Sequence, residues 1–262
     1  MILTGVELVV TEKCNLNCDG CTNLIPHYSD PENKDVNQLF EDLSIFLDAI
    51  DYVAVLKIMG GEPFLNRNLS SLINRICSNH IYAREFGKIL FITNGTVVPD
   101  NKTVDMLKKY RNKIQVYVSD YGNRSNKIEK KLRENSVVFL KYQNSDWINI
   151  GNLKNKNRDI TTLKTFNLNC SNSKYCSTIL DGKLYLCQFQ AHGVNLNLFP
   201  NDGNFVDLRE SYDLREEIKK LMSLEYIQAC NYCDIPLGIV SCKRKEVIKD
   251  KKTTVANFNE KD

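Results

Sequence analysis

Three cysteines lie close together near the start of the 262-residue chain, at Cys14, Cys18 and Cys21. Thiolates are soft ligands, suited to iron–sulfur clusters or to zinc. A cubane cluster normally takes four cysteines, so three on one short loop leave one iron open to bind a small molecule through amine and carboxylate groups. Structural zinc sites more often use paired C-x2-C knuckles. The C-x3-C-x2-C spacing therefore favours an iron–sulfur cluster, with zinc as the alternative.

Residues 6–142 alternate between short apolar segments and segments in which apolar side chains recur at helical spacing. The apolar segments predict strands at residues 6–10, 53–59, 88–93, 114–119 and 137–142. The helical spacing predicts helices at residues 36–50, 69–76, 104–110 and 128–132. Regular alternation of this kind predicts an α/β fold in which right-handed helical crossovers join parallel strands.

Polar and glycine-containing loops follow the ends of the first four predicted strands. They are the cysteine loop, Gly60-Gly61-Glu62-Pro63, Thr93-Asn94-Gly95 and Ser119-Asp120. Ligands of parallel sheets bind at the carboxyl ends of the strands, and these ends meet at one edge. The four loops are therefore expected to form one site.

Residues 11–21, Thr-Glu-Lys-Cys-Asn-Leu-Asn-Cys-Asp-Gly-Cys, resemble the signature loop of the radical S-adenosylmethionine (SAM) superfamily. Members of this superfamily bind SAM to the open iron of a 4Fe–4S cluster. One electron then cleaves SAM to methionine and a 5′-deoxyadenosyl radical, which takes a hydrogen atom from the substrate. The resemblance covers roughly residues 1–145 and implies a partial (β/α)6 TIM-like barrel.

The other loops match the family in order and placement, and the resemblance implies which residues contact SAM. The motif after the second strand binds the methionine amino group, the third strand ends beside SAM, and the fourth contacts ribose or carboxylate. The cofactor-binding residues are then Gly60, Gly61, Glu62, Pro63, Thr93, Asn94, Ser119 and Asp120. Family members often carry an aromatic residue just before the third cysteine, against the adenine, but this chain has Gly20 there. The adenine contact is therefore expected from backbone or from Leu24 or Ile25.

Six further cysteines lie in the C-terminal part of the chain. A hairpin predicted at residues 177–186, with its turn at Asp181-Gly182, and a helix predicted at residues 213–227 separate them. Their spacing resembles the auxiliary-cluster extensions called SPASM and twitch domains. A full SPASM domain has seven cysteines and two clusters, so six predict one auxiliary 4Fe–4S cluster, as in a twitch domain. The predicted ligands are Cys170, Cys187, Cys230 and Cys233. A rival set uses Cys176 or Cys242, and structural zinc is a further alternative.

Four parts of the chain follow from these patterns. We expect a radical SAM partial barrel at residues 1–150 and a polar linker at residues 151–169. A small hairpin-and-helix, twitch-like iron–sulfur domain is expected at residues 170–245, followed by a basic tail at residues 246–262.

The composition excludes several classes of protein. The net charge of +3 is spread along the chain and gives no reason to expect nucleic acid. The sequence has no run of about eighteen apolar residues that could span a membrane, and its first residues lack the pattern of a signal peptide. We therefore expect a cytoplasmic protein with neither nucleic acid nor membrane as partner. In a reducing compartment, the ten cysteines are expected to be ligands or catalytic groups rather than disulfides.

Hydrogen abstraction from a carbon that bears a hydroxyl leaves a radical that must be resolved. Loss of a proton and one more electron gives a ketone, and an auxiliary cluster could accept that electron. Alternatively, a protein thiol returns a hydrogen atom from the other face, which is epimerisation. Cys176 and Cys242 are the candidate thiols, and Asp146, after the fifth strand, is a candidate substrate contact.

The resemblance also implies a substrate class. The C-terminal cysteine spacing is similar to that of the aminocyclitol dehydrogenase of butirosin biosynthesis, so we expect a small polyol or sugar substrate: a sugar, aminocyclitol or glycan precursor. A flavodoxin- or ferredoxin-type protein is expected to supply the reducing electron. One alternative is a peptide- or protein-modifying maturase, although these commonly carry a separate peptide-binding domain. A non-enzymatic iron–sulfur or zinc protein is the other, but it would need no Gly60–Pro63 loop. His192, just past Cys187, is expected in a surface loop, and the alternative is a role in supporting the cluster ligands or in contacting the substrate.

Overall fold

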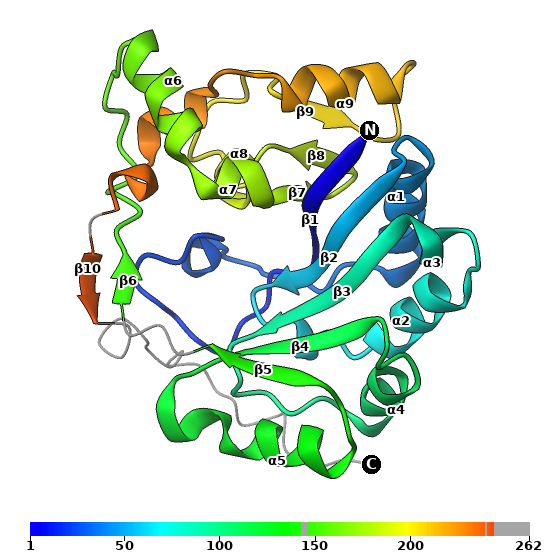
Figure 1. The fold of residues 1–262 in the computed structure, drawn as a ribbon. Coiled ribbons are helices and arrows are strands. Elements are labelled where there is room, and N and C mark those ends of the chain that lie inside the picture. The colour runs from blue at the N-terminus through cyan, green and yellow to red at the C-terminus, as the bar shows by residue number, and fades with distance from the viewer. Residues whose placement is uncertain (143–145, 239, 244–262) are drawn as a thin grey trace.

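The computed structural model describes residues 1–142, 146–238 and 240–243. Its centre is an eight-stranded sheet with the order β5-β4-β3-β2-β1-β7-β8-β9 (Figure 1). The first five strands along the chain are parallel, as the sequence predicts. They are β1 (Ile2–Thr11), β2 (Tyr52–Gly60), β3 (Phe86–Thr93), β4 (Ile114–Ser119) and β5 (Phe139–Tyr142).

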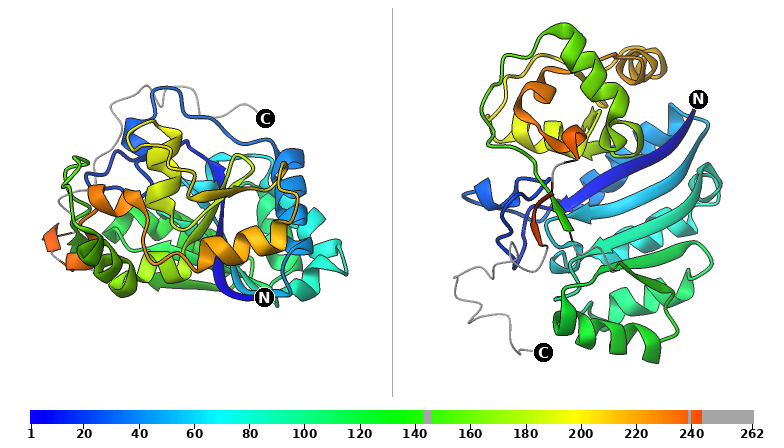
Figure 2. Two further views of the ribbon diagram at one scale, coloured as in Figure 1. Left: turned by 90° about the horizontal axis from the view of Figure 1, so that it is seen from above. Right: turned by 60° about the vertical axis from the view of Figure 1, so that its left-hand side comes forward.

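Helices connect these strands and cover one face of the sheet (Figures 1 and 2). They are α1 (Val36–Asp48), α2 (Leu69–Ser78), α3 (Tyr82–Glu85), α4 (Asn101–Lys109) and α5 (Asn126–Glu134). Aspartate side chains define two of the starts, because Asp35 accepts hydrogen bonds from the first turn of α1 and Asp100 from that of α4. Alternate strand residues such as Val6, Leu8 and Leu56 pack against these helices in the main core.

The opposite side of the sheet, here called the open face, carries the other set of alternating side chains. On β2 to β4 this set includes Lys57, Met59, Leu90, Ile92 and Tyr117, all of them half-buried. A face that is less covered than the helical face leaves room for a substrate at the centre of a partial barrel. The structure is therefore a mixed α/β fold with a parallel central sheet, as expected for a partial TIM-like barrel.

The C-terminal hairpin continues this sheet. β7 (Ser177–Leu180) pairs in parallel with β1 and supplies a sixth parallel strand, on the side of β1 away from β2. β8 (Lys183–Tyr185) and β9 (Phe205–Asp207) then pair antiparallel. Helix α8 (Gln188–Asn195) lies on the open face, because its Ala191 packs with Val9 of β1.

The remaining helical segments lie in the C-terminal part and in the loops that follow the parallel strands. They are α6 (Ile160–Asn169), α7 (Ser171–Tyr175), α9 (Leu214–Met222), and the 3-10 helices η1 (Ile25–His27), η2 (Pro63–Leu65), η3 (Gly122–Ser125), η4 (Gln228–Tyr232) and η5 (Ile235–Leu237). β6 (Asp146–Ile148) and β10 (Val240–Lys243) form a separate antiparallel pair.

Helix α6 occupies the second half of the segment predicted as a linker, and Asp159 caps it by accepting from Thr162 N. The division of the chain into four parts stays a prediction, and the basic tail at residues 246–262 lies outside the described residues. Within the described ranges, every helix is too short or too polar to cross a bilayer.

Candidate active site

The glycine pair after β2 lies directly against the cysteine loop after β1. Gly61 N donates to Thr11 O at 2.9 Å, and Glu62 N donates to Lys13 O at 2.8 Å. A Cβ on Gly60 would stand 2.1 Å from Thr11 O, and one on Gly61 would stand 2.9 Å from the Cβ of Cys14. Only glycine permits this approach. The cysteine loop is therefore held against the Gly60–Pro63 motif, which is expected to bind methionine.

The three N-terminal cysteines lie near one another at this edge. Burial raises the pKa of the Cys14 thiol to about 12, and Glu62, Cys21 and Cys18 raise it further. Burial also raises the pKa of Cys21. A bound metal centre reverses this balance, since a coordinating thiol is deprotonated. Three adjacent soft donors fit a 4Fe–4S cluster with one iron open to a small molecule.

Glu62 is fully buried and is held by the ends of two strands. It accepts hydrogen bonds from Thr93 Oγ1 at 2.8 Å and from Asn94 N at 2.8 Å. Burial raises its pKa to about 7. A nearby ammonium would favour the ionised carboxylate, so Glu62 fits the amino group of SAM.

Asn94 connects the third loop to the cysteine loop. Its Nδ2 donates to Asn15 Oδ1 at 3.0 Å and lies 3.6 Å from Cys14 Sγ. Asn15 in turn donates to Thr96 Oγ1 at 2.7 Å. The structure thus brings the first three predicted loops together, and the spacing of strand ends was the signal that found them.

Ser119 and Asp120 end β4 at the same edge of the sheet. Asp120 accepts from Gly122 N at 2.9 Å and forms an ion pair with Lys141 at 3.3 Å. Lys141 also pairs with Glu129 at 2.9 Å. The assignment of Ser119 and Asp120 to SAM stays a prediction.

An indole occupies the position that an aromatic residue before Cys21 would fill. Gly20 has φ +68°, and a Cβ built on it would stand 2.9 Å from Trp147 Nε1. Trp147 Nε1 also donates to Gly20 O at 3.1 Å. The side chains of Leu24 and Ile25 are buried, at 1% and 2% exposed, and the adenine contact expected from backbone or from these residues stays a prediction.

Four C-terminal cysteines surround one narrow cavity. Cys170 immediately precedes α7, Cys187 is the N-cap of α8, Cys230 lies in η4 and Cys233 follows η4. The cavity walls include Phe166, Phe189 and Ile227 together with Cys170, Cys187, Cys230 and Cys233. Burial raises the pKa of Cys187 well above its usual value, and the other three cysteines raise it further. Four soft donors at one place fit a fully ligated cluster.

Arg158 holds two of these cysteines from outside the cavity. Its Nη1 donates to the backbone oxygens of Cys230 and Cys233, the latter at 2.8 Å, and its Nη2 pairs with Asp234. Among the described residues, no three His, Cys, Asp or Glu side chains converge on one metal ion. Zinc ligands sit about 2.0–2.3 Å from one ion, whereas the thiolates around a cubane cluster each bind a different iron. Measuring the zinc and iron content of the protein would distinguish a zinc site from an iron–sulfur cluster.

Cys176 lies elsewhere, on the open face. Its Sγ accepts from Lys57 Nζ at 3.3 Å, and Lys57 pairs with the buried Glu7 at 3.1 Å. Burial raises the Cys176 pKa to about 12. Lys57 and Glu7 were missed, although single charges inside apolar strands were a signal for them.

Asp146 and Cys242, the two other predicted candidates, belong to the small antiparallel pair of β6 and β10. The side chain of Asp146 and the side chain of Cys242 lie outside the described parts, although their backbones belong to β6 and β10. The roles predicted for them therefore stay predictions.

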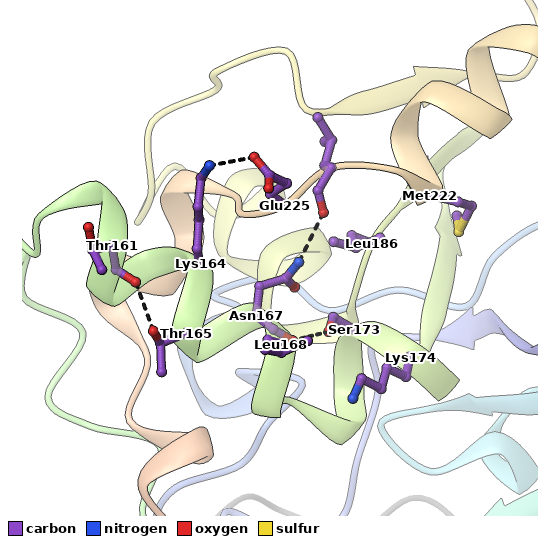
Figure 3. A pocket seen from close by; sticks show the side chains of 11 residues that line it. Thr161, Lys164, Thr165, Asn167, Leu168, Ser173, Lys174, Leu186, Met222 and Glu225 are labelled. Carbon is purple, nitrogen blue, oxygen red and sulfur yellow. Dashed lines mark hydrogen bonds and ion pairs between the residues drawn. The ribbon is translucent and has the colours of Figure 1, made fainter.

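A larger cavity of about 610 Å³ opens between α6, α7 and α9 (Figure 3). Asn167 and Ser173 line both this cavity and the narrow one that holds the four cysteines. Lys164 and Glu225 form an ion pair at its rim, at 2.6 Å. The larger cavity therefore lies next to the four-cysteine site.

Curated relatives match only part of this chain. A GTP 3′,8-cyclase of Helicobacter pylori (strain J99) is 30% identical over 96 residues, which is 36% of this chain and 28% of the relative. An S-adenosylmethionine-dependent nucleotide dehydratase of Selenomonas ruminantium is 31% identical over 100 residues, 37% of this chain and 32% of the relative. The chain therefore spans about a third of the length of these relatives.

Solved structures match over most of the chain. BtrN in complex with AdoMet and 2-DOIA has a TM-score of 0.52 at 16% identity, covering 94% of this chain and 97% of BtrN. The enzyme anSMEcpe with bound AdoMet and a Cp18Cys peptide has a TM-score of 0.51 at 12% identity, covering 89% of each chain. At such identities the likeness shows the fold alone. The family model described as the radical SAM superfamily matches residues 8–138, half of the chain. With the three-cysteine loop, the glycine pair and the buried glutamate at one sheet edge, this chain belongs to the radical SAM superfamily.

Proposed function

We propose that this chain oxidises a carbinol carbon of a sugar, aminocyclitol or glycan precursor to a ketone. The observation that carries the proposal is the gathering of Cys170, Cys187, Cys230 and Cys233 around one cavity. Such an oxidation must dispose of one electron after hydrogen abstraction, and a second cluster can accept it. The structural likeness to BtrN supports a fold suited to this arrangement.

The chain's own residues divide the work at the first site. Cys14, Cys18 and Cys21 hold the cluster and leave one iron free for SAM. Glu62 receives the amino group of SAM, and the indole of Trp147 lies where the adenine stacks. When bound, cluster and SAM together supply the radical that removes a hydrogen atom from the substrate.

The electrons balance only with a second site. The substrate radical loses its hydroxyl proton and one electron to become the ketone. The four C-terminal cysteines would hold a 4Fe–4S cluster able to accept that electron, and the cavity beside α6 would give a redox partner access to it. A flavodoxin- or ferredoxin-type protein of the cytoplasm is the expected donor of the electron that cleaves SAM.

Epimerisation is the second candidate, and the placement of Cys176 favours it. Its thiol lies on the open face beside Lys57, and its pKa of about 12 keeps it protonated at neutral pH. A protonated thiol can return a hydrogen atom to a substrate radical. The thiyl radical left on Cys176 then takes one electron from the flavodoxin- or ferredoxin-type donor and one proton from solvent, so the net reaction needs an electron donor and no electron acceptor.

Metal content and SAM cleavage test the proposal. The anaerobically reconstituted protein should hold about eight irons and eight sulfides per chain, and Cys187→Ala about four of each. The reduced protein should form 5′-deoxyadenosine. Zinc in place of iron, or 5′-deoxyadenosine at background level, would contradict the proposal. Ketone formed from a polyol by the unaltered protein but not by Cys187→Ala is the expected outcome for oxidation.

A further inference from the structure

Helix α8 contains two buried polar atoms that have no hydrogen-bond partner within the described part of the chain. They are Oε1 of Gln188 and Nε2 of His192. Gln188 is 7% exposed and His192 is 0% exposed, so His192 is not in the surface loop expected from sequence. Buried polar groups in folded proteins are nearly always bonded, and leaving one unpaired is costly. Two such atoms on one helix indicate a place that a polar ligand completes.

Gln188 and His192 share one side of α8, a helix that contacts Tyr28 and is capped by Cys187. Residues 188 and 192 are four apart and are therefore neighbours on one helix face. His192 Nδ1 is 2.8 Å from the hydroxyl of Tyr28, which follows the three-cysteine loop. Cys187, one of the four C-terminal cysteines, is the N-cap of α8 and immediately precedes Gln188. A ligand at this face would lie between the cluster that starts the reaction and the site that accepts the electron.

The neighbouring hydrogen bonds are compatible with a proton on Nε2 of His192. Asn195 Nδ2 donates to the Tyr28 hydroxyl oxygen at 3.1 Å, which leaves the Tyr28 proton free to donate to His192 Nδ1. Burial lowers the pKa of His192 to about 3, so the ring is neutral, and with Tyr28 as the donor to Nδ1 the ring proton lies on Nε2. In this tautomer the face of α8 offers one donor, Nε2–H, and one acceptor, Gln188 Oε1.

One donor beside one acceptor is the complement of a single hydroxyl group, which accepts one hydrogen bond and donates another. We propose that Gln188 and His192 bind one hydroxyl group of a polyol substrate and so hold its carbinol carbon between the two clusters. This inference rests on the proposed function, because it assumes a polyol substrate. It adds the residues that recognise the polyol and a test that does not depend on SAM cleavage.

Affinity for polyol probes is the first measurement. Myo-inositol and glucosamine are titrated into the reconstituted holoenzyme with SAM present. Gln188→Met removes the acceptor at similar size and should weaken binding about tenfold or more. His192→Asn keeps a polar group near the position of Nδ1 but not of Nε2 and should weaken binding similarly. His192→Gln, which reaches the position of Nε2, should retain more affinity.

Thermal stability is the second measurement, with Gln190 as the matched control. Gln190 is buried on the same helix but bonded, to Leu186 N at 3.0 Å and to Asn204 O at 2.6 Å. Gln190→Met should therefore lower the melting temperature of the ligand-free holoenzyme. Gln188→Met should leave it unchanged or raise it, because methionine removes an unpaired polar group.

Each result decides one way. A lower melting temperature for Gln188→Met would mean that a structural partner, such as a buried water, already satisfies Gln188, and would overturn the inference. Equal probe affinity in the wild type and the Gln188→Met and His192→Asn variants would overturn it too, as would failure of the wild type to bind either probe. If the reduced holoenzyme forms no 5′-deoxyadenosine, the proposed function fails instead, whatever the probes show.

Discussion

Replacing Trp147 with alanine should weaken SAM binding about 5- to 150-fold, because stacking of a base on an aromatic side chain is worth about 1–3 kcal/mol. The position of the Trp147 indole is the reason to expect that it stacks on the adenine of SAM. The half-buried indole stands 2.9 Å from where a Cβ of residue 20 would be, which is the place of the aromatic residue in related loops. Trp147→Phe keeps a ring but loses the Nε1 hydrogen bond to Gly20 O, so it should cost about 2- to 12-fold.

The assay compares SAM with methionine, a probe that lacks the adenine. Equilibrium dialysis with the anaerobically reconstituted protein gives both dissociation constants. Trp147→Ala should weaken SAM binding and leave methionine binding unchanged. Trp147 is the only tryptophan of the chain, so its fluorescence reports binding from the same side chain. SAM should change the emission and methionine should not.

A compensating change separates stacking from loop damage. Gly20→Phe alone should weaken SAM binding, because its side chain collides with the indole. In the Trp147→Ala background the same change should restore part of the affinity, less the strain of φ +68° at a residue other than glycine. The two effects are then strongly non-additive. Equal losses for SAM and methionine in Trp147→Ala, or no loss for SAM, would refute the stacking role.

Three further predictions address the other parts of the two sites. Gly61→Ala places a Cβ 2.3 Å from Lys13 O, so the iron content should fall from about eight to about four atoms per chain. The control Gly203→Ala, whose Cβ meets nothing within 4 Å, should keep its iron. The raised pKa of Glu62 means that the folded state holds this proton more tightly than the unfolded chain. Without SAM, the free energy of unfolding should therefore fall as pH rises from 4.5 to about 7. The affinity for SAM should rise with pH near 7, because SAM's amino group binds the ionised carboxylate. Both trends should vanish in Glu62→Gln. In D2O, epimerisation by Cys176 would place deuterium in the product and Cys176→Ala would abolish it, whereas oxidation predicts ketone without deuterium in both proteins, as read by mass spectrometry.

The parallel strands could be predicted from sequence because each is a short apolar run followed by a polar loop. Local spacing also gave the hairpin turn, where Asp181 and Gly182 adopt φ values of 51° and 75°. The pairing of β7 with β1 could not be predicted, because it joins residues about 170 positions apart and leaves no local pattern. Helix α6 was missed since its segment is rich in polar residues, although Asp159 before Thr162 is a capping signal.

The candidate sites divide in the same way. Cysteine spacing and the family resemblance predicted Cys170, Cys187, Cys230 and Cys233 as ligands, and the structure places all four around one cavity, while their binding of a cluster stays a prediction. The contacts of Trp147 with Gly20 and of His192 with Tyr28 join segments more than a hundred residues apart. Such contacts depend on tertiary packing, which residue type and spacing do not specify.

The joining of β7 to β1 bears on why the two cysteine sites can work together. An auxiliary domain on a flexible linker would let its distance from the SAM site vary, and electron transfer would vary with it. Here β7 is hydrogen-bonded into the sheet at Val6 to Leu8, and Ala191 of α8 packs on Val9, so the strand that leads to the three-cysteine loop also holds the helix that Cys187 caps. The sheet thus ties the position of the helix that Cys187 caps to that of the three-cysteine loop, which is the rigid arrangement that the proposed electron transfer requires.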